Sequence, residues 1–321
     1  VLFAAFYSTQ EISANSFLVT VSIYGVAGLK LLPAFQNIFY FASEIQARSK
    51  YLNNITPLIN KIITQESFKF SEHDYPFKKL VEFSNVSFSY ETGLKEAIRD
   101  LSLKIEAGKK VAIIGPSGSG KSTFIDILLG FIKPSSGEIT IDGKPLNKTN
   151  HIKYRENFSY VPQKLFLLEA SLRENIIFGS SESMNSEDKL TKALLASQAN
   201  TFIDNLSNGI DTLVSDSNLS LSGGQKQAIG VARAIYHGGK ILVLDEATSA
   251  MDTGLEERIM DEIAQSNFKT IIAITHKPSM LKYFDEIYIF NEGTIEANGT
   301  YEDLKSTNQF LSEMINVSKS G

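Results

Sequence analysis

One segment of this chain reads Gly115-Pro116-Ser117-Gly118-Ser119-Gly120-Lys121-Ser122-Thr123 and fits the pattern G-x-x-x-x-G-K-S/T. The apolar run Lys110–Ile114 before it predicts a buried strand, and the run Phe124–Leu129 after it predicts a helix. A glycine loop between a strand and a helix N-terminus points backbone N–H groups and the positive end of the helix dipole at an anion. We therefore expect a nucleoside-triphosphate site, in which Lys121 neutralises the β- and γ-phosphates and the Ser122 hydroxyl ligates Mg²⁺. An ordinary Gly/Ser-rich turn would account for the loop but not for both flanks.

A second apolar run, Ile241–Leu244, is followed directly by Asp245 and Glu246. Open α/β sheets bind their ligands at the carboxyl ends of the strands, so acids at this point face the ligand. Asp245 is placed to hold Mg²⁺, directly or through water, and Glu246 to orient and polarise the attacking water. Taken alone this pattern is weak, because acidic residues are common at helix N-termini.

Composition limits the classes of function. A chain of 321 residues has room for about two domains. The net charge of −5 argues against a nucleic-acid partner. The absence of cysteine excludes disulfides, thiolate metal sites and cysteine nucleophiles, and four scattered histidines make a histidine metal cluster unexpected. Because the chain begins at Val1 inside an apolar run, we expect a fragment of a longer protein.

The run Phe17–Ala42 is apolar and is interrupted mainly by Lys30, Gln36 and Asn37. At about 1.5 Å per residue, a helix of this length crosses the ~30 Å hydrocarbon core of a bilayer. The alternative is a core helix of a soluble protein. Lys30 has two interpretations, since it can extend its ammonium to a polar interface or line a transport path. Pro33 is expected to kink the helix.

The residues on either side of this run favour a membrane span. Arg48, Lys50 and Lys61 lie on its C-terminal side, whereas the polar turn Ser8–Ser13 carries no basic residue. The positive-inside tendency places the C-terminal side in the cytoplasm. The short apolar run Val1–Tyr7 predicts the end of a preceding helix, so that the two helices form the last hairpin of a transmembrane bundle.

Three regions follow from these patterns. Residues 1–64 are the transmembrane part, whose helical spacing continues past a bend expected at Pro57, and the polar residues 65–79 form a linker. In residues 80–321, β-rich apolar runs alternate with helical segments, including a helix expected over Glu187–Leu206. This alternation predicts an α/β domain with a largely parallel sheet and helices on both faces. The expected strands are 81–90, 98–105, 110–114, 137–142, 241–244, 270–274 and 287–290.

The segment Leu221-Ser222-Gly223-Gly224-Gln225 resembles the signature of ATP-binding-cassette (ABC) ATPases. The resemblance covers residues 80 to about 315 and implies a P-loop NTPase cassette with an antiparallel β subdomain and a helical subdomain. It also implies ATP and Mg²⁺ as cofactors. Four further positions match the family in order: Tyr90 on the adenine, Gln163 at Mg²⁺ and water, Asp252 in the D-loop, and His276 near the γ-phosphate.

The residues of the signature themselves favour a dimer. Ser222-Gly223-Gly224 precedes a helix expected over Gln225–Tyr236, which makes a second anion-binding helix N-terminus. One nucleotide cannot engage both termini of a single chain, because the phosphate loop already covers its phosphates. A two-fold dimer, in which each signature faces the partner's nucleotide, resolves this, whereas the alternative is a simple helix cap. We expect a second cassette as partner in a homodimer, with a heterodimer left open.

Three positions depart from the family's pattern. Ala228 and Lys277 stand where arginines are usual, and Ser215–Asn218 replaces a Gly-Glu-x-Gly segment. We expect none of them to contact the reacting atoms. The departure at Ser215–Asn218 bears on how the cassette docks on the membrane part.

Together these features predict the last transmembrane helix and the ATPase domain of an exporter-type half-transporter in the cell membrane, with the cassette in the cytoplasm. ATP hydrolysis would drive export or flipping of a substrate across the bilayer. The segment Leu29–Asn37 resembles the matching helix of oligosaccharide or lipid-linked glycan exporters, while polysaccharide, lipid and peptide substrates stay open. One alternative is a soluble ABC ATPase of DNA repair or translation, against which Phe17–Ala42 argues. Another is a P-loop kinase or GTPase, which does not explain Leu221–Gln225.

Overall fold

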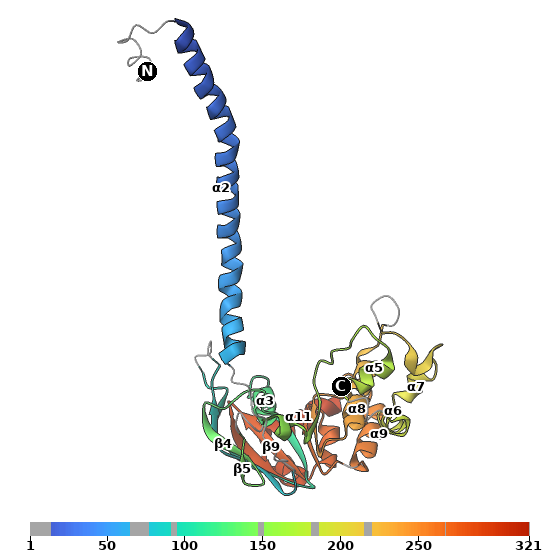
Figure 1. The fold of residues 1–321 in the computed structure, drawn as a ribbon. Coiled ribbons are helices and arrows are strands. Elements are labelled where there is room, and N and C mark those ends of the chain that lie inside the picture. Colours follow the sequence, from blue (N-terminus) through green and yellow to red (C-terminus); the bar gives the residue numbers. More distant parts are fainter. Residues whose placement is uncertain are drawn as a thin grey trace. The chain divides into compact units, whose positions relative to one another are not determined.

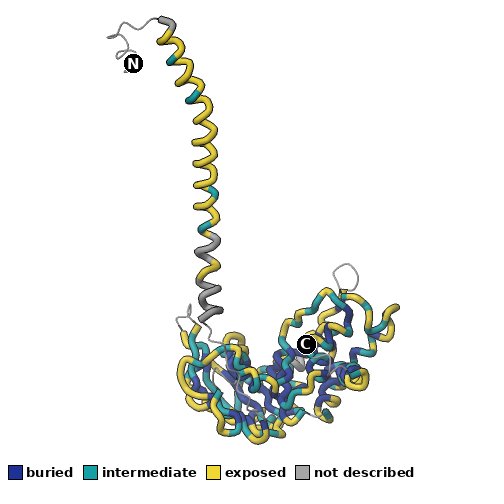
Figure 2. Tube along the Cα trace, viewed as in Figure 1, coloured by how far each residue is buried: buried dark blue, intermediate teal, exposed yellow. Residues whose placement is uncertain are grey.

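The computed structural model describes residues 14–64, 77–90, 95–146, 151–180, 186–214, 220–266 and 268–320. The chain divides into two compact units, residues 1–68 and 69–321. Figure 1 shows the helices and strands of each unit, and Figure 2 shows how far each residue is buried.

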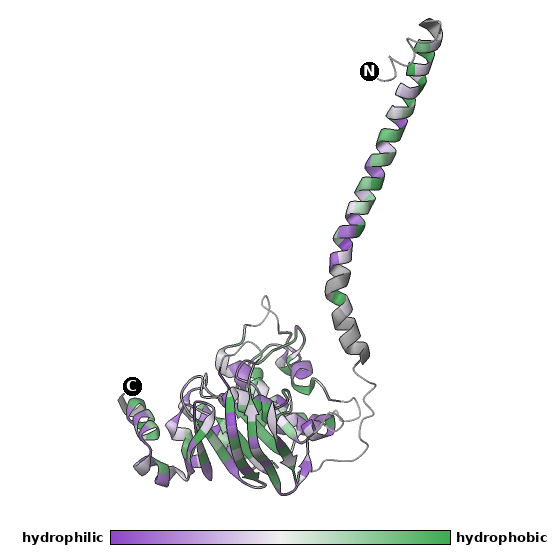
Figure 3. Cartoon of the chain, turned by 90° about the vertical axis from the view of Figure 1, so that its left-hand side faces the viewer, coloured by the Kyte–Doolittle hydropathy of each residue, from purple (hydrophilic) through white to green (hydrophobic). Residues whose placement is uncertain are grey.

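The first unit contains one long helix, α2 (Ala14–Thr64), of 51 residues. Its segment Ser16–Lys50 is long and apolar enough to cross a membrane, and its most apolar part is not buried against the chain. Large side chains such as Leu29 and Phe39 are 74% and 76% exposed. Figures 2 and 3 show this exposed and largely apolar surface along the helix. A helix that is apolar on all sides is typical of a membrane span.

α2 passes Pro33 and Pro57 without interruption. Figure 1 shows a gentle curve along α2, and the kinks expected at these prolines stay predictions. A proline removes one backbone hydrogen bond from a helix, and neighbouring turns can accommodate that loss. The helix end predicted at residues 1–7 and the turn predicted at 8–13 lie outside the described residues. Residues 65–76 of the predicted linker also lie outside them.

The second unit is built on a six-stranded sheet in the order β10-β9-β3-β8-β7-β6. All neighbours pair in parallel except β10, which forms an antiparallel hairpin with β9. The central strands are buried on both faces, which explains why their sequences are continuously apolar. The strands are β3 (Lys110–Ile114), β6 (Phe158–Val161), β7 (Ile241–Asp245), β8 (Thr270–Ile274), β9 (Glu286–Asn291) and β10 (Thr294–Gly299).

A smaller antiparallel sheet has the order β2-β1-β4-β5. Its strands are β1 (Leu80–Phe88), β2 (Ile98–Glu106), β4 (Ser136–Ile141) and β5 (Lys144–Pro145). The chain enters this sheet through contacts with Asp142, whose carboxylate accepts hydrogen bonds of 2.8 Å from the N–H groups of Lys78, Lys79 and Leu80. Phe77 is fully buried. Residues 77–79, predicted as the end of the linker, are therefore attached to the second unit.

Two apolar cores lie on the two faces of the six-stranded sheet. Val111 and Ile113 of β3 belong to the core shared with the smaller sheet and helix α3 (Lys121–Leu128). Ala112 and Ile114 belong to the core formed with α8 (Gly223–His237) and α9 (Thr253–Ala264). The remaining helices are α4 (His151–Arg155), α5 (Leu172–Ile177), α6 (Glu187–Ala196), α7 (Asn200–Ile203), η2 (Gly209–Asp211), η3 (Pro278–Tyr283), α10 (Tyr301–Thr307) and α11 (Gln309–Ser320).

The structure differs from the sequence prediction in one helix and three strands, among other elements. The helix expected over 187–206 is two helices, α6 and α7, because Gln198 between them has a φ of +57°. An L-residue in this left-handed conformation ends a right-handed helix. Strands β5, β6 and β10 were not predicted. All three lie at the edge of a sheet, where a strand is short or partly exposed and its apolar signal is weak.

Candidate functional site

The predicted phosphate-binding loop lies between β3 and α3, the strand and helix expected on its two sides. Gly115 has a φ of +148°, and a Cβ there would lie 2.2 Å from the Phe290 carbonyl oxygen. Gly120 has a φ of +101°, and a Cβ there would lie 2.6 Å from the Ala97 carbonyl oxygen. Both positions therefore need glycine, which lets the loop turn tightly into the N-terminus of α3.

Lys121 is 7% exposed and extends its side chain back along the loop. Its Nζ donates hydrogen bonds to the carbonyl oxygens of Gly115 at 2.8 Å and Pro116 at 2.9 Å. Burial lowers the pKa of Lys121, although the nearby carboxylates of Glu246 and Asp245 act in the opposite direction. The loop thus holds an ammonium group beside the free N–H groups of a helix N-terminus, a donor set that fits phosphate.

Tyr90 follows β1 and reaches the same helix. Its hydroxyl lies 3.2 Å from Thr123 Oγ1, and its ring stands edge-on to Phe88 with centroids 4.9 Å apart. Tyr90 keeps 46% of its surface exposed. An aromatic face is therefore available beside the phosphate loop, where the resemblance places the adenine.

Two acidic side chains lie at the carboxyl end of β7. Asp245 is 8% exposed, and Tyr160 on the neighbouring strand β6 donates a hydrogen bond to its Oδ2 at 3.4 Å. Burial, together with the negative charge of Glu246, raises the pKa of Asp245. A buried carboxylate of this kind gains from a cation placed beside it.

Glu246 has a φ of +49°, and its N–H donates to the Ile274 carbonyl oxygen at 3.1 Å. Its carboxylate is held on both sides. Gln163 Nε2 donates to Oε2 at 2.7 Å, and His276 Nε2 lies 3.1 Å from Oε1. The three residues follow β6, β7 and β8, which are neighbours in the sheet. The structure therefore brings together Gln163, Glu246 and His276, three of the residues that the sequence analysis assigned to the nucleotide site.

The signature segment begins helix α8. Ser222 Oγ accepts from the Gln225 N–H at 3.2 Å, and Gln225 Oε1 accepts from the Ser222 N–H at 2.9 Å, which makes a capping box. A Cβ on Gly223 would lie 3.1 Å from the Ala250 Cβ, so the helix starts in close contact with the D-loop. Among the described contacts none joins residues 222–225 to the phosphate loop, and Figure 1 draws α8 apart from α3.

Comparison with known proteins identifies the domain. Residues 98–249 match the family model described as ABC transporter. The chain carries an ABC transporter domain. Its second unit has the cassette fold that this family implies, and the domain is an ATP-binding one.

The related proteins include an ABC transporter, an export protein and a flippase. The chain is 36% identical over 288 residues to "ABC transporter B family member 17" of Arabidopsis thaliana, covering 89% of this chain and 23% of that protein. It is 34% identical to a "Putative export ATP-binding/permease protein" of Rickettsia felis, covering 85% and 47%. It is 37% identical to the "ATP-dependent lipid A-core flippase" of Desulfotalea psychrophila, covering 71% and 40%.

A solved structure of a bacterial Atm1-family ABC exporter with ATP bound is also similar. The TM-score is 0.75 at 30% sequence identity, with 84% of this chain and 48% of that chain covered. The chain thus spans less than half the length of the relatives it matches.

Replacing Tyr90 in this ABC domain with alanine should weaken the binding of ATP and GTP alike. Stacking of a ring on a base does not depend on the exocyclic groups of the base, and it contributes about 1–3 kcal/mol of binding free energy. Titration with fluorescent analogues of both nucleotides measures the loss, and Tyr90→Phe serves as the control because it keeps the ring and loses the bond to Thr123. Unchanged affinity in Tyr90→Ala would show that Tyr90 is a surface aromatic at a strand end.

The D-loop is held by a lysine that the sequence marked only as a departure from the family. Lys277 Nζ donates to the carbonyl oxygens of Thr248 and Met251 at 3.1 Å each, and to Glu256 Oε2 at 2.8 Å. Glu256 is fully buried in α9 and also accepts a hydrogen bond from the Thr248 hydroxyl. Lys277 contacts none of the reacting groups named above but fixes the loop that follows Glu246.

Replacing Lys277 with methionine should lower the free energy of unfolding by about 3 kcal/mol, because it leaves the buried Glu256 carboxylate without its partner. Denaturant unfolding measures this loss. Lys282→Met is the matched control, since the Lys282–Glu257 pair lies on the surface and contributes little. A second change, Glu256→Gln, should restore part of the stability of Lys277→Met. Equal unfolding midpoints for the two lysine variants would contradict a structural role for the buried pair.

Asp252, the last residue of the D-loop, caps α9 through a bond of 2.9 Å from the Leu255 N–H to its carboxylate. No described contact links it to the phosphate loop of its own chain. The segment Ser215–Asn218, whose departure bears on docking, lies outside the described residues.

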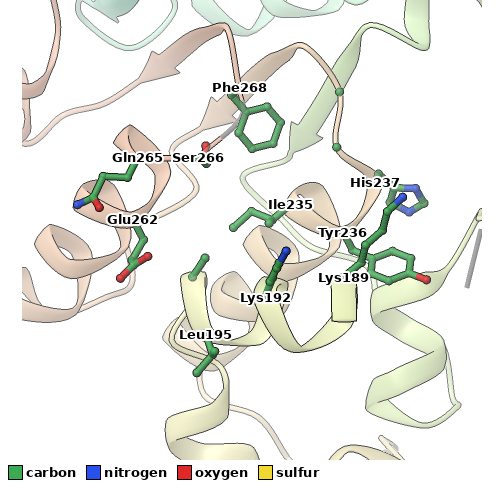
Figure 4. Close-up of a pocket in the computed structure, with 13 residues that line it drawn as sticks. Lys189, Lys192, Leu195, Ile235, Tyr236, His237, Glu262, Gln265, Ser266 and Phe268 are labelled. Carbon is green, nitrogen blue, oxygen red and sulfur yellow. The ribbon is translucent and has the colours of Figure 1, made fainter. Parts of the chain in front are cut away.

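Two cavities differ in their relation to this site. One of about 710 Å³ lies between α6 and the C-terminal ends of α8 and α9, where Lys192, Tyr236 and Glu262 line it (Figure 4). It contains none of the predicted site residues. Another of about 440 Å³ borders the phosphate loop at Pro116–Ser119 and extends to Lys95. The cavity that matches the sequence prediction is therefore the smaller one.

Proposed function

We propose that this chain is the C-terminal part of an ABC exporter that hydrolyses ATP to move a substrate across a membrane. The observation that carries the proposal is the grouping of Gln163, Glu246 and His276 at the carboxyl ends of three neighbouring strands. A P-loop kinase transfers its phosphoryl group to a substrate and not to water, so it has no need of a carboxylate positioned to activate water. The apolar helix α2 adds the connection to a membrane.

In the proposed reaction, Lys121 and the N-terminus of α3 hold the phosphates, and Tyr90 holds the base. Glu246 accepts a proton from water as the water oxygen attacks the γ-phosphorus. The bond from that phosphorus to the ADP oxygen then breaks. Gln163 and His276 keep the Glu246 carboxylate in place. His276 would also contact the γ-phosphate, as the family resemblance implies.

Mg²⁺ would be held by the Ser122 hydroxyl, Asp245 and Gln163. Within the described part of the chain no group of three or more histidine or acidic side chains could hold a metal alone. Phosphate oxygens and water would therefore complete the coordination, as is usual for this ion. When bound, Mg²⁺ neutralises charge that develops on the phosphates. The raised pKa of the buried Asp245 is the feature that a cation would relieve.

The proposed active form is a two-fold dimer of cassettes, in which Ser222, Gly223, Gly224 and Gln225 face the nucleotide bound by the partner. The separation of α8 from α3 within one chain supports this arrangement. Asp252 would then serve the interface between the cassettes. A homodimer is the simpler case, and a heterodimer with a related cassette would use the same contacts.

The relatives bear on the substrate class. One is named as a putative export ATP-binding/permease protein and another as an ATP-dependent lipid A-core flippase. We propose a lipid or lipid-linked oligosaccharide substrate, with the protein in the cell membrane. The basic residues Arg48 and Lys50 at the C-terminal side of the span support a cytoplasmic cassette in this proposal.

The test uses the complete protein in inside-out membrane vesicles. ATP should drive the movement of a fluorescent phospholipid between leaflets, with Glu246→Gln as the inactive control. Washing the membranes with carbonate separates the main alternative, because a soluble ABC ATPase of DNA repair or translation would be released. Release of the protein, or equal lipid movement in the control, would overturn the proposal.

A further inference from the structure

Gln227 is a polar residue on the buried side of α8 that the sequence prediction did not single out. It is 7% exposed, although its neighbours Ala228 and Ile229 are apolar core residues. Its side-chain amide is fully used. Nε2 donates to the Glu246 carbonyl oxygen at 3.3 Å and to Ser249 Oγ at 3.1 Å, and Oε1 accepts from the Ala250 N–H at 2.9 Å.

These three bonds all go to one short loop, which runs from Glu246 to the D-loop. Glu246 is the residue of that loop with a left-handed backbone. When the Gln227 amide fixes the Glu246 carbonyl oxygen, it also fixes the rotation of the adjoining peptide group. The direction of the Glu246 side chain is fixed with it. The opposite end of the loop is fixed by the bond to Ala250.

The same helix also carries the signature. Gly223 and Gly224, one turn before Gln227, pack against Ala250, where their Cβ positions would lie 3.1 Å from its Cβ and 3.2 Å from its carbonyl oxygen. The loop from 246 to 250 is therefore held by both the start of α8 and the Gln227 amide. A displacement of the signature can reach Glu246 through rigid contacts within one chain.

We infer that Gln227 is a positioning residue, which holds Glu246 in its reactive orientation and ties it to the signature segment of the same chain. The inference rests on the proposed function. It means that the signature segment, which would face the partner's nucleotide, and Glu246, which would act on the nucleotide of its own chain, move together. A buried amide that only satisfies its own hydrogen bonds would have no such effect on the reaction.

The test is Gln227→Met in the complete protein, because methionine keeps the length and shape of glutamine and removes its hydrogen bonds. We expect kcat for ATP hydrolysis to fall on the order of tenfold to a hundredfold, since small misplacement of a reacting group has effects of this size. ATP binding should change less than about twofold in dissociation constant, because Lys121 and Tyr90 are not touched. Gln265→Met, on the exposed end of α9, is the matched control.

A second measurement separates this role from a mere effect on the signature. With ATP, Gln227→Met should accumulate the closed cassette dimer, as Glu246→Gln does, because closure succeeds and hydrolysis fails. Cross-linking across the dimer interface measures the closed fraction. A reduced closed fraction would show that Gln227 acts by shaping the signature for the partner, and unchanged kcat would show that it is a satisfied core amide. Either result overturns the inference.

If Gln227→Met lowers the melting temperature too far for assay, Gln227→Asn replaces it. That variant keeps the amide but is one methylene too short to reach Glu246 and Ala250 together, so the same pattern of lower kcat and more closed dimer is expected. Failure of the proposed function is recognised separately. In that case Glu246→Gln itself would neither lose hydrolysis nor accumulate the closed dimer, whatever the result at position 227.

Discussion

Replacing Glu246 with glutamine should reduce ATP hydrolysis about 10²–10⁴-fold, while MgATP binds with near-normal affinity. Glutamine keeps the size of the side chain and can still bond to Gln163 and His276, but it cannot take a proton from water. Single-turnover hydrolysis measures the chemical step directly, and a filter-binding assay measures affinity. The same variant should accumulate an ATP-bound dimer.

The control for this experiment is Glu187→Gln. Glu187 is an exposed acid of α6 whose carboxylate pairs with Arg173 at the surface. It should hydrolyse ATP like the wild type. If Glu246→Gln retained more than half of the wild-type turnover, Glu246 would not be the general base, and the proposed chemistry would need another acceptor for the proton.

Replacing Ser222 with arginine should abolish turnover, on the order of 10²-fold or more, without weakening ATP binding to a single cassette. The long cation would occupy the helix N-terminus that we propose for the partner's phosphates. The control is Ser186→Arg, which removes the corresponding cap at α6. Both variants lose a cap worth about 1 kcal/mol, so only the effect on turnover should distinguish them.

Mixing Ser222→Arg with Lys121→Ala tests the shared site further. A mixed dimer has one site with both defects and one site with neither, so random pairing gives up to about a quarter of the wild-type activity if the two sites act independently. Such recovery excludes a site contained in one chain. Normal turnover of Ser222→Arg alone, with specific activity independent of protein concentration, would contradict the trans role of the signature.

The sequence was most informative where chemistry demands a fixed order of residues. The loop at 115–123 and the acids after β7 need particular residues at particular spacings, so their roles could be predicted without a structure. Gln163 was assigned to the site only by the family resemblance, since β6 was not predicted. The grouping of Glu246 with His276 could be predicted because the strands before them were expected to be parallel, and parallel strands end at a common edge. The hydrogen-bond distances of 2.7 and 3.1 Å could not be predicted, since they depend on packing of the whole sheet.

The contacts that the sequence did not predict are those made by single side chains across the fold. Gln227 and Glu256 are polar residues on buried helix faces, and nothing local indicates their partners. The only available signal was a polar residue where helical periodicity predicts an apolar one. Lys277 was noted as a replacement for arginine, but its bonds to Thr248 and Met251 depend on the path of the D-loop. The break at Gln198 was missed because its flanks have ordinary helical patterns.

Because the backbone at Glu246 is left-handed, the residue that would be best for thermal stability differs from the residue that turnover needs. A non-glycine residue in this conformation costs the folded state on the order of 1–3 kcal/mol, and glycine would relieve most of that cost. Glycine, however, carries no carboxylate. The cassette therefore keeps strain at the residue that we propose to activate water, and the surrounding contacts must offset it. Selection for heat resistance alone would favour loss of the side chain on which the proposed reaction depends.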